Sequence, residues 1–265
     1  MSAALEQVLD GIGEAAVAVS GGVDSLTLAV LAGRRLGPER VLMVHAVSPA
    51  VPSEATDRVH RHAEAEGWRL EVIDAGEFAD PRYLANPVNR CFFCKASLYG
   101  AIASRTSLQV LSGANTDDLT EYRPGLDAAR DHGVRHPYLE AGLDKAAVRA
   151  LARRLGLDEA AELPASPCLA SRVETGLAID PEELAAIHRA ETLLRQALKP
   201  RTVRCRIRAA GVVLELDAET LAALAPPEQR GLSAAVAALM PPAVAARGVG
   251  FAPYRTGSAF VVAPP

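Results

Sequence analysis

The chain carries a short glycine-containing loop whose residue types suit phosphate binding. Residues 20–25 read Ser-Gly-Gly-Val-Asp-Ser, after an apolar run at 15–19 and before a helical pattern from about residue 25. Two glycines let successive amide N–H groups point at an anion, and a helix start favours negative charge there. Ser20 and Ser25 add hydroxyl donors. The loop lacks the spacing of a Walker loop and no lysine is nearby, so we expect another kind of phosphate site. The alternative is a serine-capped turn.

A second polar segment, Gly-Ala-Asn-Thr-Asp-Asp at 113–118, follows an apolar run at 108–111. If that run is a strand of the same sheet, the segment emerges at the carboxyl edge, where open α/β folds bind ligands. Asp117 and Asp118 then either hold magnesium against phosphates or solvate a turn, since aspartate favours turns in any case.

Three of the four cysteines have a pattern that suits metal binding. Cys91 and Cys94 are three residues apart, a spacing that can place both thiolates on one metal or cluster, and Cys168 supplies a third. Three thiolates suit a cluster with one open iron, or a catalytic metal with an exchangeable ligand. The alternatives are a reactive Cys168 whose thiolate Arg172 favours, or buried apolar cysteines at 91 and 94.

Arginines alternate with apolar residues along 202–208, a period typical of a strand. Arg204, Arg206 and Arg208 would share one face, and their guanidinium groups suit bidentate binding of phosphate or carboxylate. The alternative is a solvated edge strand. Cys205 falls on the opposite, apolar face, so we expect it to be a core residue.

These segments require strands that alternate with helices in the first part of the chain. Strands are predicted at 15–19, 41–47, 70–73 and 108–111, and helices at 25–36, 53–66, 94–104 and 144–155. This order predicts an α/β fold with a doubly wound, mostly parallel sheet in a domain at 1–160. A helix at 181–198, strands at 202–208 and 212–216, a helix at 227–239 and a strand at 259–263 predict a smaller α+β domain at 161–265.

The amino-acid composition argues against two classes of binding partner, nucleic acids and membranes. The 28 basic and 32 acidic residues give a net charge of −4, which argues against nucleic-acid binding through an extended basic surface. No secretory signal and no apolar stretch long enough to span a membrane are recognisable. We therefore expect a cytoplasmic protein without a membrane partner, in which clustered cysteines indicate metal binding or catalysis rather than disulfides.

The loop at 20–25 is the signature of the PP-loop ATP pyrophosphatases, which cleave ATP to AMP and pyrophosphate. Together with Asn-Arg-Cys-Phe-Phe-Cys-Lys at 89–95, the segments at 113–119, 121–125 and 167–172, and the arginines before Gly211, it resembles the LarE family of ATP-dependent sulfur transferases. This resemblance covers most of the chain. It implies an adenine nucleotide alpha hydrolase-like fold, ATP and Mg²⁺ as cofactors, and a homo-oligomer.

The resemblance also implies a reaction and a set of site residues. ATP adenylates a carboxylate of a pyridinium mononucleotide, and a sulfur nucleophile then displaces AMP to give the thiocarboxylate, in nickel-pincer nucleotide biosynthesis. The residues implied for ATP are Ser20, Gly21, Gly22, Asp24, Ser25, Gly113, Asn115, Asp118 and Arg123. Those implied for the substrate are Ser171, Arg172, Arg206, Arg208 and Glu215, with Glu191 in a further family position. Asp24 and Cys168 are the catalytic candidates.

The family has two sources of sulfur. Some members sacrifice the cysteine that matches Cys168, and others hold a [4Fe-4S] cluster on three cysteines, whose free iron binds the sulfide to be delivered. Because this chain has Cys91 and Cys94 as well as Cys168, we favour the cluster. Alternative functions are a PP-loop tRNA thiolase, an amide-forming synthetase such as those that make NAD or GMP, and a non-enzymatic regulator.

Overall fold

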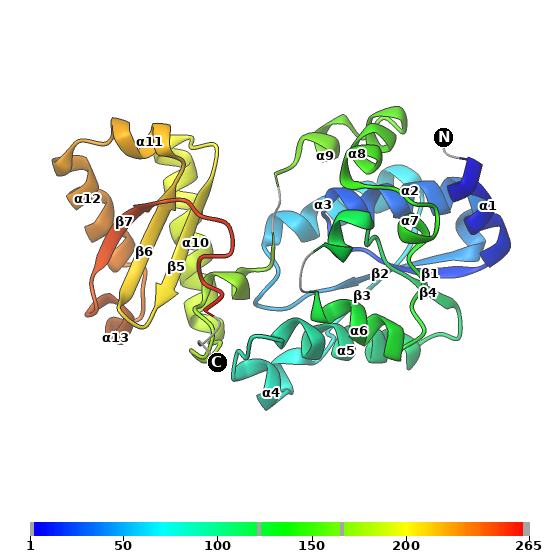
Figure 1. The fold of residues 1–265 in the computed structure, drawn as a ribbon, viewed down its shortest axis with the longest axis horizontal. Coiled ribbons are helices and arrows are strands. Elements are labelled where there is room, and N and C mark those ends of the chain that lie inside the picture. Colours follow the sequence, from blue (N-terminus) through cyan, green and yellow to red (C-terminus); the bar gives the residue numbers. More distant parts are fainter. Residues whose placement is uncertain (1–2, 121–122, 165–166, 262–265) are drawn as a thin grey trace. The chain divides into compact units, whose positions relative to one another are not determined.

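The computed structural model describes residues 3–120, 123–164 and 167–261, which form two compact units (Figure 1). The first unit holds residues 3–80 and 89–164, and the second holds 81–88 and 167–261. The boundary expected at 160–161 lies a few residues before the division in the structure. The short helix α4 (Pro81–Leu84) belongs to the second unit although it lies within the first part of the chain.

The first unit contains a parallel four-stranded sheet in the order β3-β2-β1-β4. Its strands are β1 (Ala15–Ala18), β2 (Val41–Ala46), β3 (Arg69–Ile73) and β4 (Gln109–Leu111). All four lie where the apolar runs predicted them. The strand order reverses direction at β1, because β2 and β3 continue on one side and β4 pairs on the other. The carboxyl ends of β1 and β4 therefore mark the place where an α/β sheet binds its ligand.

Helices cover both faces of this sheet (Figure 1). They are α1 (Ala3–Ile12), α2 (Val23–Leu36), α3 (Ser53–Glu66), α5 (Arg90–Ala103), α6 (Pro124–Asp131), α7 (Pro137–Glu140), α8 (Lys145–Arg154) and α9 (Asp158–Glu162). Val17 of β1 packs into a core with α1, α2 and α8, whereas Ala16 faces a second core with α5 and α6. Successive strand residues point to opposite faces, so the predicted doubly wound α/β fold is confirmed.

The second unit is an α+β structure around a three-stranded sheet in the order β5-β6-β7. Its elements beyond α4 are α10 (Pro181–Leu198), β5 (Val203–Arg208), β6 (Gly211–Leu216), α11 (Ala218–Ala223), α12 (Pro226–Ala237), α13 (Pro242–Ala245) and β7 (Val249–Pro253). β5 and β6 lie where strands were predicted and are antiparallel, and β7 is parallel to β6.

Two elements lie at other positions in the structure than the sequence predicts. The last strand was expected at 259–263 but is β7, at Val249–Pro253; residues 259–261 are not in a strand, and 262–263 lie outside the described residues. Helix α5 begins at Arg90 rather than at Cys94, so it includes both cysteines of the pair. Within the described residues, no helix combines the length and apolarity that a membrane crossing requires.

Gly21 permits a close approach between the loop after β1 and helix α3. Its φ of +77° is a conformation that side chains disfavour. A Cβ there would also lie 2.4 Å from the carbonyl oxygen of Ala55. Gly22 has an ordinary φ of −87°, and a Cβ there would meet only the Ser20 hydroxyl, at 3.6 Å. The two glycines therefore differ, and only the first is required by backbone geometry and packing.

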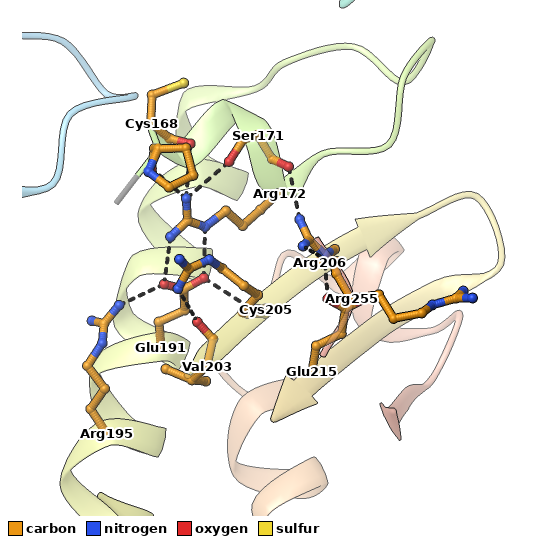
Figure 2. A network of polar contacts seen from close by, with 12 residues as sticks. Cys168, Ser171, Arg172, Glu191, Arg195, Val203, Cys205, Arg206, Glu215 and Arg255 are labelled. Carbon is orange, nitrogen blue, oxygen red and sulfur yellow. Dashed lines mark hydrogen bonds and ion pairs between the residues drawn. The ribbon is translucent and has the colours of Figure 1, made fainter. Parts of the chain in front are cut away.

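A buried carboxylate organises the second unit (Figure 2). Glu191 of α10 is fully buried and accepts hydrogen bonds from Arg172 Nε (2.9 Å), Arg172 Nη2 (3.1 Å), Arg195 Nη2 (2.8 Å) and the Cys205 amide (3.1 Å). Burial by itself raises the pKa of a carboxyl, but the hydrogen bonds and charge of Arg172 outweigh it and lower the pKa of Glu191. Glu191 thus ties α10 to β5 and to the turn that contains Arg172.

We predict that Gly21→Ala destabilises the protein far more than Gly22→Ala does. The first substitution adds a strained φ and a clash with the Ala55 backbone, which together cost about 2 kcal/mol or more. The second substitution adds a methyl group with room around it. Urea unfolding of both variants checks the difference, and equal losses would contradict the assigned role of Gly21.

Removing the charge of Glu191 should lower the free energy of unfolding by about 3–5 kcal/mol, because Arg172 is left buried without its counter-ion. Since the folded pKa is depressed, the stabilisation is present above the ordinary glutamate pKa and is lost as the pH falls through the folded pKa. Glu191→Gln should therefore be less sensitive to acid than the wild type.

Glu219→Gln is the matched control, because Glu219 pairs with Arg201 at the surface and its side chain is 77% exposed. It should change the free energy of unfolding by less than about 1 kcal/mol. Denaturant melts of the three proteins over a range of acidic pH values give both results. A Glu191→Gln protein as stable as the control at neutral pH would refute the assignment.

Candidate active site

The loops after β1 and β4 meet at the carboxyl edge of the first unit's sheet. Asn115 Nδ2 donates to Asp24 Oδ1 at 3.4 Å, which links the two loops directly. Gly113 packs against the backbone of Asp24, where a Cβ would lie 3.0 Å from the Asp24 carbonyl carbon and 3.1 Å from the Ser25 nitrogen. The sequence expectation that these two polar segments share one edge is confirmed.

Hydrogen bonds between its serines close the loop at 20–25. The Ser20 amide donates to Ser25 Oγ at 3.0 Å, the two hydroxyl oxygens lie 3.0 Å apart, and Ser25 Oγ donates to the Gly22 carbonyl at 3.2 Å. Helix α2 starts at Val23, and its N-cap residue Gly22 provides no side-chain cap. Its first amide groups thus keep donor capacity for a ligand, and the helix dipole favours an anion there.

Asp24 is held by residues that no local motif revealed. Lys145 Nζ forms an ion pair with Asp24 Oδ2, and Tyr138 Oη donates to the Asp24 backbone carbonyl at 3.1 Å. Lys145 is the first residue of α8, a helix that Asp144 caps by accepting from the Ala147 amide at 2.7 Å. No lysine is close to the loop in sequence, but the fold places one there. The cap at Asp144 could be predicted, whereas the approach of α8 to Asp24 could not.

Asp118 and Arg123 form a second charged pair at this edge, 3.0 Å apart. Asp118 Oδ2 also accepts from the Asn115 amide at 3.1 Å, and Asn115 Oδ1 accepts from the Asp117 amide at 3.1 Å, which makes a capping box. Asn115 and Asp118 therefore shape this turn, and Asn115 also contacts the loop at 20–25. Tyr122 and Glu121, in the motif expected at 121–125, lie outside the described residues.

Two histidines near this edge were not expected. His45 of β2 contacts the Val19 carbonyl at 2.8 Å through Nδ1 and Thr56 Oγ1 at 3.0 Å through Nε2. Burial lowers the pKa of His45, and burial also lowers that of His136, beside Ser112. Both imidazoles are therefore biased towards the neutral form, so they add little positive charge for an anion near neutral pH.

The cysteines divide by burial and by unit. Cys91 and Cys94 lie on α5 of the first unit and are half-buried, and Cys168 is exposed in the second unit. Cys205 is fully buried and burial raises the pKa of its thiol far above the ordinary value, so its expected place in the core is confirmed. Within the described residues, no three His, Cys, Asp or Glu side chains come together as a metal-binding group.

Arg172 binds the backbone around Cys168 rather than its sulfur (Figure 2). Its Nη1 donates to the carbonyl oxygens of Pro167 (2.6 Å) and Cys168 (3.1 Å) and to Ser171 Oγ (3.1 Å). Nε and Nη2 are occupied by Glu191. Every nitrogen of this guanidinium group has an internal partner, so Arg172 acts on Cys168 by holding its loop in position.

The arginine strand β5 is not the solvated edge strand considered as the alternative. Arg206 is 4% exposed, and its Nε, Nη1 and Nη2 donate to Glu215 Oε2 (2.8 Å), the Ser171 carbonyl (3.1 Å) and the Arg255 carbonyl (3.3 Å). Arg208 also pairs with Glu215, at 2.8 Å. Glu215 is buried and accepts a third group, the Ser258 hydroxyl, at 2.6 Å.

Arg208 differs from Arg206 in having unused donor capacity. Its side chain is 23% exposed, and its buried Nε has no hydrogen-bond partner in the described part of the chain. It borders a cleft of about 480 Å³. The cleft is lined by Arg208, Val213, Glu215, Gly250, Phe251, Ala252, Pro253 and Arg255. Two guanidinium groups at a partly apolar cleft suit an anionic group attached to a flat ring. Sequence reasoning missed Arg255, which lies outside the alternating strand.

No family model matches the chain, but its sequence is similar to those of several known proteins. An uncharacterized protein of Synechocystis sp. is 38% identical over 72% of each chain. The NH(3)-dependent NAD(+) synthetase of Hyperthermus butylicus is 35% identical over 58% of each chain. The pyridinium-3,5-bisthiocarboxylic acid mononucleotide synthase of Lactiplantibacillus plantarum is 32% identical over 77% of this chain and 75% of its own. The chain therefore belongs to the LarE family of the PP-loop superfamily.

Proposed function

We propose that the protein is an ATP-dependent sulfur transferase that converts a carboxylate of a pyridinium mononucleotide into a thiocarboxylate. The observation that carries this proposal is the convergence of Lys145 and Asn115 on Asp24 beside an uncapped helix start. This arrangement offers amide donors and a cation to a phosphate chain at the strand-order reversal of an α/β sheet. The relative named as a mononucleotide synthase supports the choice of substrate.

In the first step, a substrate carboxylate oxygen bonds to the α-phosphorus of ATP and pyrophosphate leaves with the electron pair of the broken P–O bond. The amides that begin α2 and the side chain of Lys145 would stabilise the phosphate charge. Mg²⁺ would enter with ATP as a counter-ion of its phosphates, with Asp24 and Asp118 as the carboxylates at this edge. In the second step, a sulfur nucleophile attacks the acyl carbon and AMP leaves.

Arg208 and Arg255 would bind the anionic groups of the mononucleotide at the cleft in the second unit. Arg206, each of whose three guanidinium nitrogens has an internal partner, would position Glu215 and thereby Arg208. Ser171 and Arg172 would hold the turn that carries Cys168. These roles revise the sequence expectation that Arg172 and Arg206 contact the substrate themselves.

For sulfur delivery we favour a [4Fe-4S] cluster on Cys91, Cys94 and Cys168. The donor set fits in its chemistry, since all four cysteines are thiols and the fourth, Cys205, is confined to the core. When bound, such a cluster would supply the sulfur atom for the second step. From the sequence we retain the expectations of a cytoplasmic homo-oligomer that binds no nucleic acid.

The function is tested with ATP, Mg²⁺, a sulfide source and pyridinium dicarboxylate mononucleotide, using protein purified and reconstituted with iron under anaerobic conditions. Mass spectrometry should find AMP, pyrophosphate and thiocarboxylate in more than one turnover per chain. A single turnover, in which the sulfur of Cys168 ends in the thiocarboxylate and residue 168 becomes dehydroalanine, would indicate sacrifice of Cys168 instead. Thiolation of tRNA with no reaction of the mononucleotide would favour the tRNA thiolase.

The cluster is tested in the same preparation by visible absorbance and iron content. Cys91→Ala, Cys94→Ala and Cys168→Ala should each lose most of the iron. Cys205→Ala is the matched control and should keep it, since this thiol is buried in the core of the second unit. Iron retained by Cys168→Ala, or lost from Cys205→Ala alone, would exclude the proposed ligand set.

Arg208→Ala should raise the KM for the mononucleotide by about 10- to 100-fold, as expected for the loss of charge-assisted hydrogen bonds at an anion. Its KM for ATP should not change. Arg201→Ala is the control, because Arg201 is 82% exposed and pairs at the surface with Glu219. Steady-state kinetics with each substrate varied separately give the comparison. If the KM for ATP rose in parallel, Arg208 would have a general structural role.

A further inference from the structure

Helix α3 brings a positively charged side chain to the phosphate loop. Ala55 of α3 packs on Gly21 so closely that its carbonyl oxygen lies 2.4 Å from where a Cβ would be. Arg58 lies three residues later and hence on the same face of the helix. Its Nε donates to the Gly21 carbonyl at 3.0 Å. The contact joins a side chain from the helix after β2 to the loop after β1.

The hydrogen bond from Arg58 controls the direction of an amide in the loop. The peptide group between Gly21 and Gly22 is planar and trans, so its carbonyl and its N–H point in opposite directions. By holding the Gly21 carbonyl towards α3, Arg58 turns the Gly22 N–H away from α3. Gly22 is the N-cap residue of α2, next to the amides that have no side-chain cap. Arg58 thus preorients donors that face an anion.

Among the described residues, the remaining donors of Arg58 have no hydrogen-bond partner. In the described part of the chain its guanidinium makes one hydrogen bond, through Nε, and no carboxylate lies within 4.0 Å of it. Glu54, Asp57 and Glu159 act on it only from a distance, and Arg61 opposes them. The group is half-buried, and burial lowers the pKa of Arg58. An arginine remains charged even so, and an anion beside it would compensate for the lost hydration.

Lys145 also brings a positive charge to the loop, but it differs from Arg58 in having a paired carboxylate. It is already paired with Asp24, so its charge is compensated within the protein. Arg34 and Arg135, two further arginines of this unit, also pair with carboxylates, at 2.6 and 2.5 Å. Among these four described cations, Arg58 is the one without a paired carboxylate, and a ligand with several negative charges would interact strongly with it.

We propose that Arg58 binds the phosphates of ATP that leave as pyrophosphate, while its Nε keeps the Gly21–Gly22 peptide in the orientation for binding. This inference rests on the proposed use of ATP. As the bond between the α-phosphorus and its bridging oxygen breaks, the electron pair passes to pyrophosphate, whose charge increases. A positioned guanidinium group stabilises that charge more in the transition state than in bound ATP, and so accelerates adenylation.

The test measures binding of ATP, AMP and inorganic pyrophosphate by titration calorimetry, and pyrophosphate release with saturating mononucleotide. Arg58→Ala should weaken binding of ATP and of pyrophosphate by about tenfold or more, leave AMP binding nearly unchanged, and lower kcat. Arg58→Lys keeps the charge and should recover part of the pyrophosphate affinity. Arg61→Ala is the control from the same helix, since Arg61 is 60% exposed and 3.9 Å from Glu159.

Equal loss of AMP, ATP and pyrophosphate binding in Arg58→Ala would show that Arg58 only shapes the loop and would overturn the proposal. So would affinities and kcat equal to those of the wild type. If Arg58→Ala fails to fold, Arg58→Gln replaces it, because glutamine keeps an N–H donor for Gly21 without the charge. A wild-type protein that binds neither ATP nor pyrophosphate would instead refute the proposed function, and this inference with it.

Discussion

The arrangement of the first unit depends on one steric constraint, the absence of a Cβ at residue 21. Gly21 adopts a positive φ, and the Ala55 carbonyl oxygen lies 2.4 Å from where its Cβ would be. Helix α3 can therefore touch the loop, which brings Arg58 within hydrogen-bonding distance of the Gly21 carbonyl. The same turn leaves the start of α2 without a side-chain cap. The contact between Gly21 and α3 sets both the direction of the loop's amide donors and the position of the Arg58 charge. A methyl group at residue 21 would therefore disturb the whole loop.

In the second unit, buried carboxylates compensate the positive charge of arginines. Glu191 compensates Arg172 and Arg195, and Glu215 compensates Arg206 and Arg208. Buried cations without such partners would carry a large desolvation cost. The compensation is uneven, because Arg172 and Arg206 use every guanidinium nitrogen internally, whereas Nε of Arg208 has no partner among the described residues. A cluster of arginines is thus divided into residues that support the fold and one that can still bind an anion.

Each unit supplies different groups for the proposed reaction. The first unit has the features of a nucleotide site, namely loops at a strand-order reversal, an uncapped helix start and cations of two kinds. The second has a cleft of about 480 Å³ bordered by Arg208 and Arg255, together with the exposed Cys168. The three cysteines proposed to hold a cluster come from both units, with Cys91 and Cys94 on α5 and Cys168 in the other.

The sequence by itself determined the strands of the parallel sheet, most of its helices, the phosphate loop and the core position of Cys205. These features follow from local patterns: apolar runs, helix caps such as Asp144, and alternation along 203–208. Only the tertiary structure decided that Lys145 and Arg58 meet the loop, that β7 lies at 249–253, and that Arg206 is buried while Arg208 borders a cleft. Each of these depends on contacts between segments distant in sequence, where packing and charge compensation outweigh local preference. Residue type therefore indicated which groups are suited to anion binding, and packing decided which of them keep unused hydrogen-bond donors.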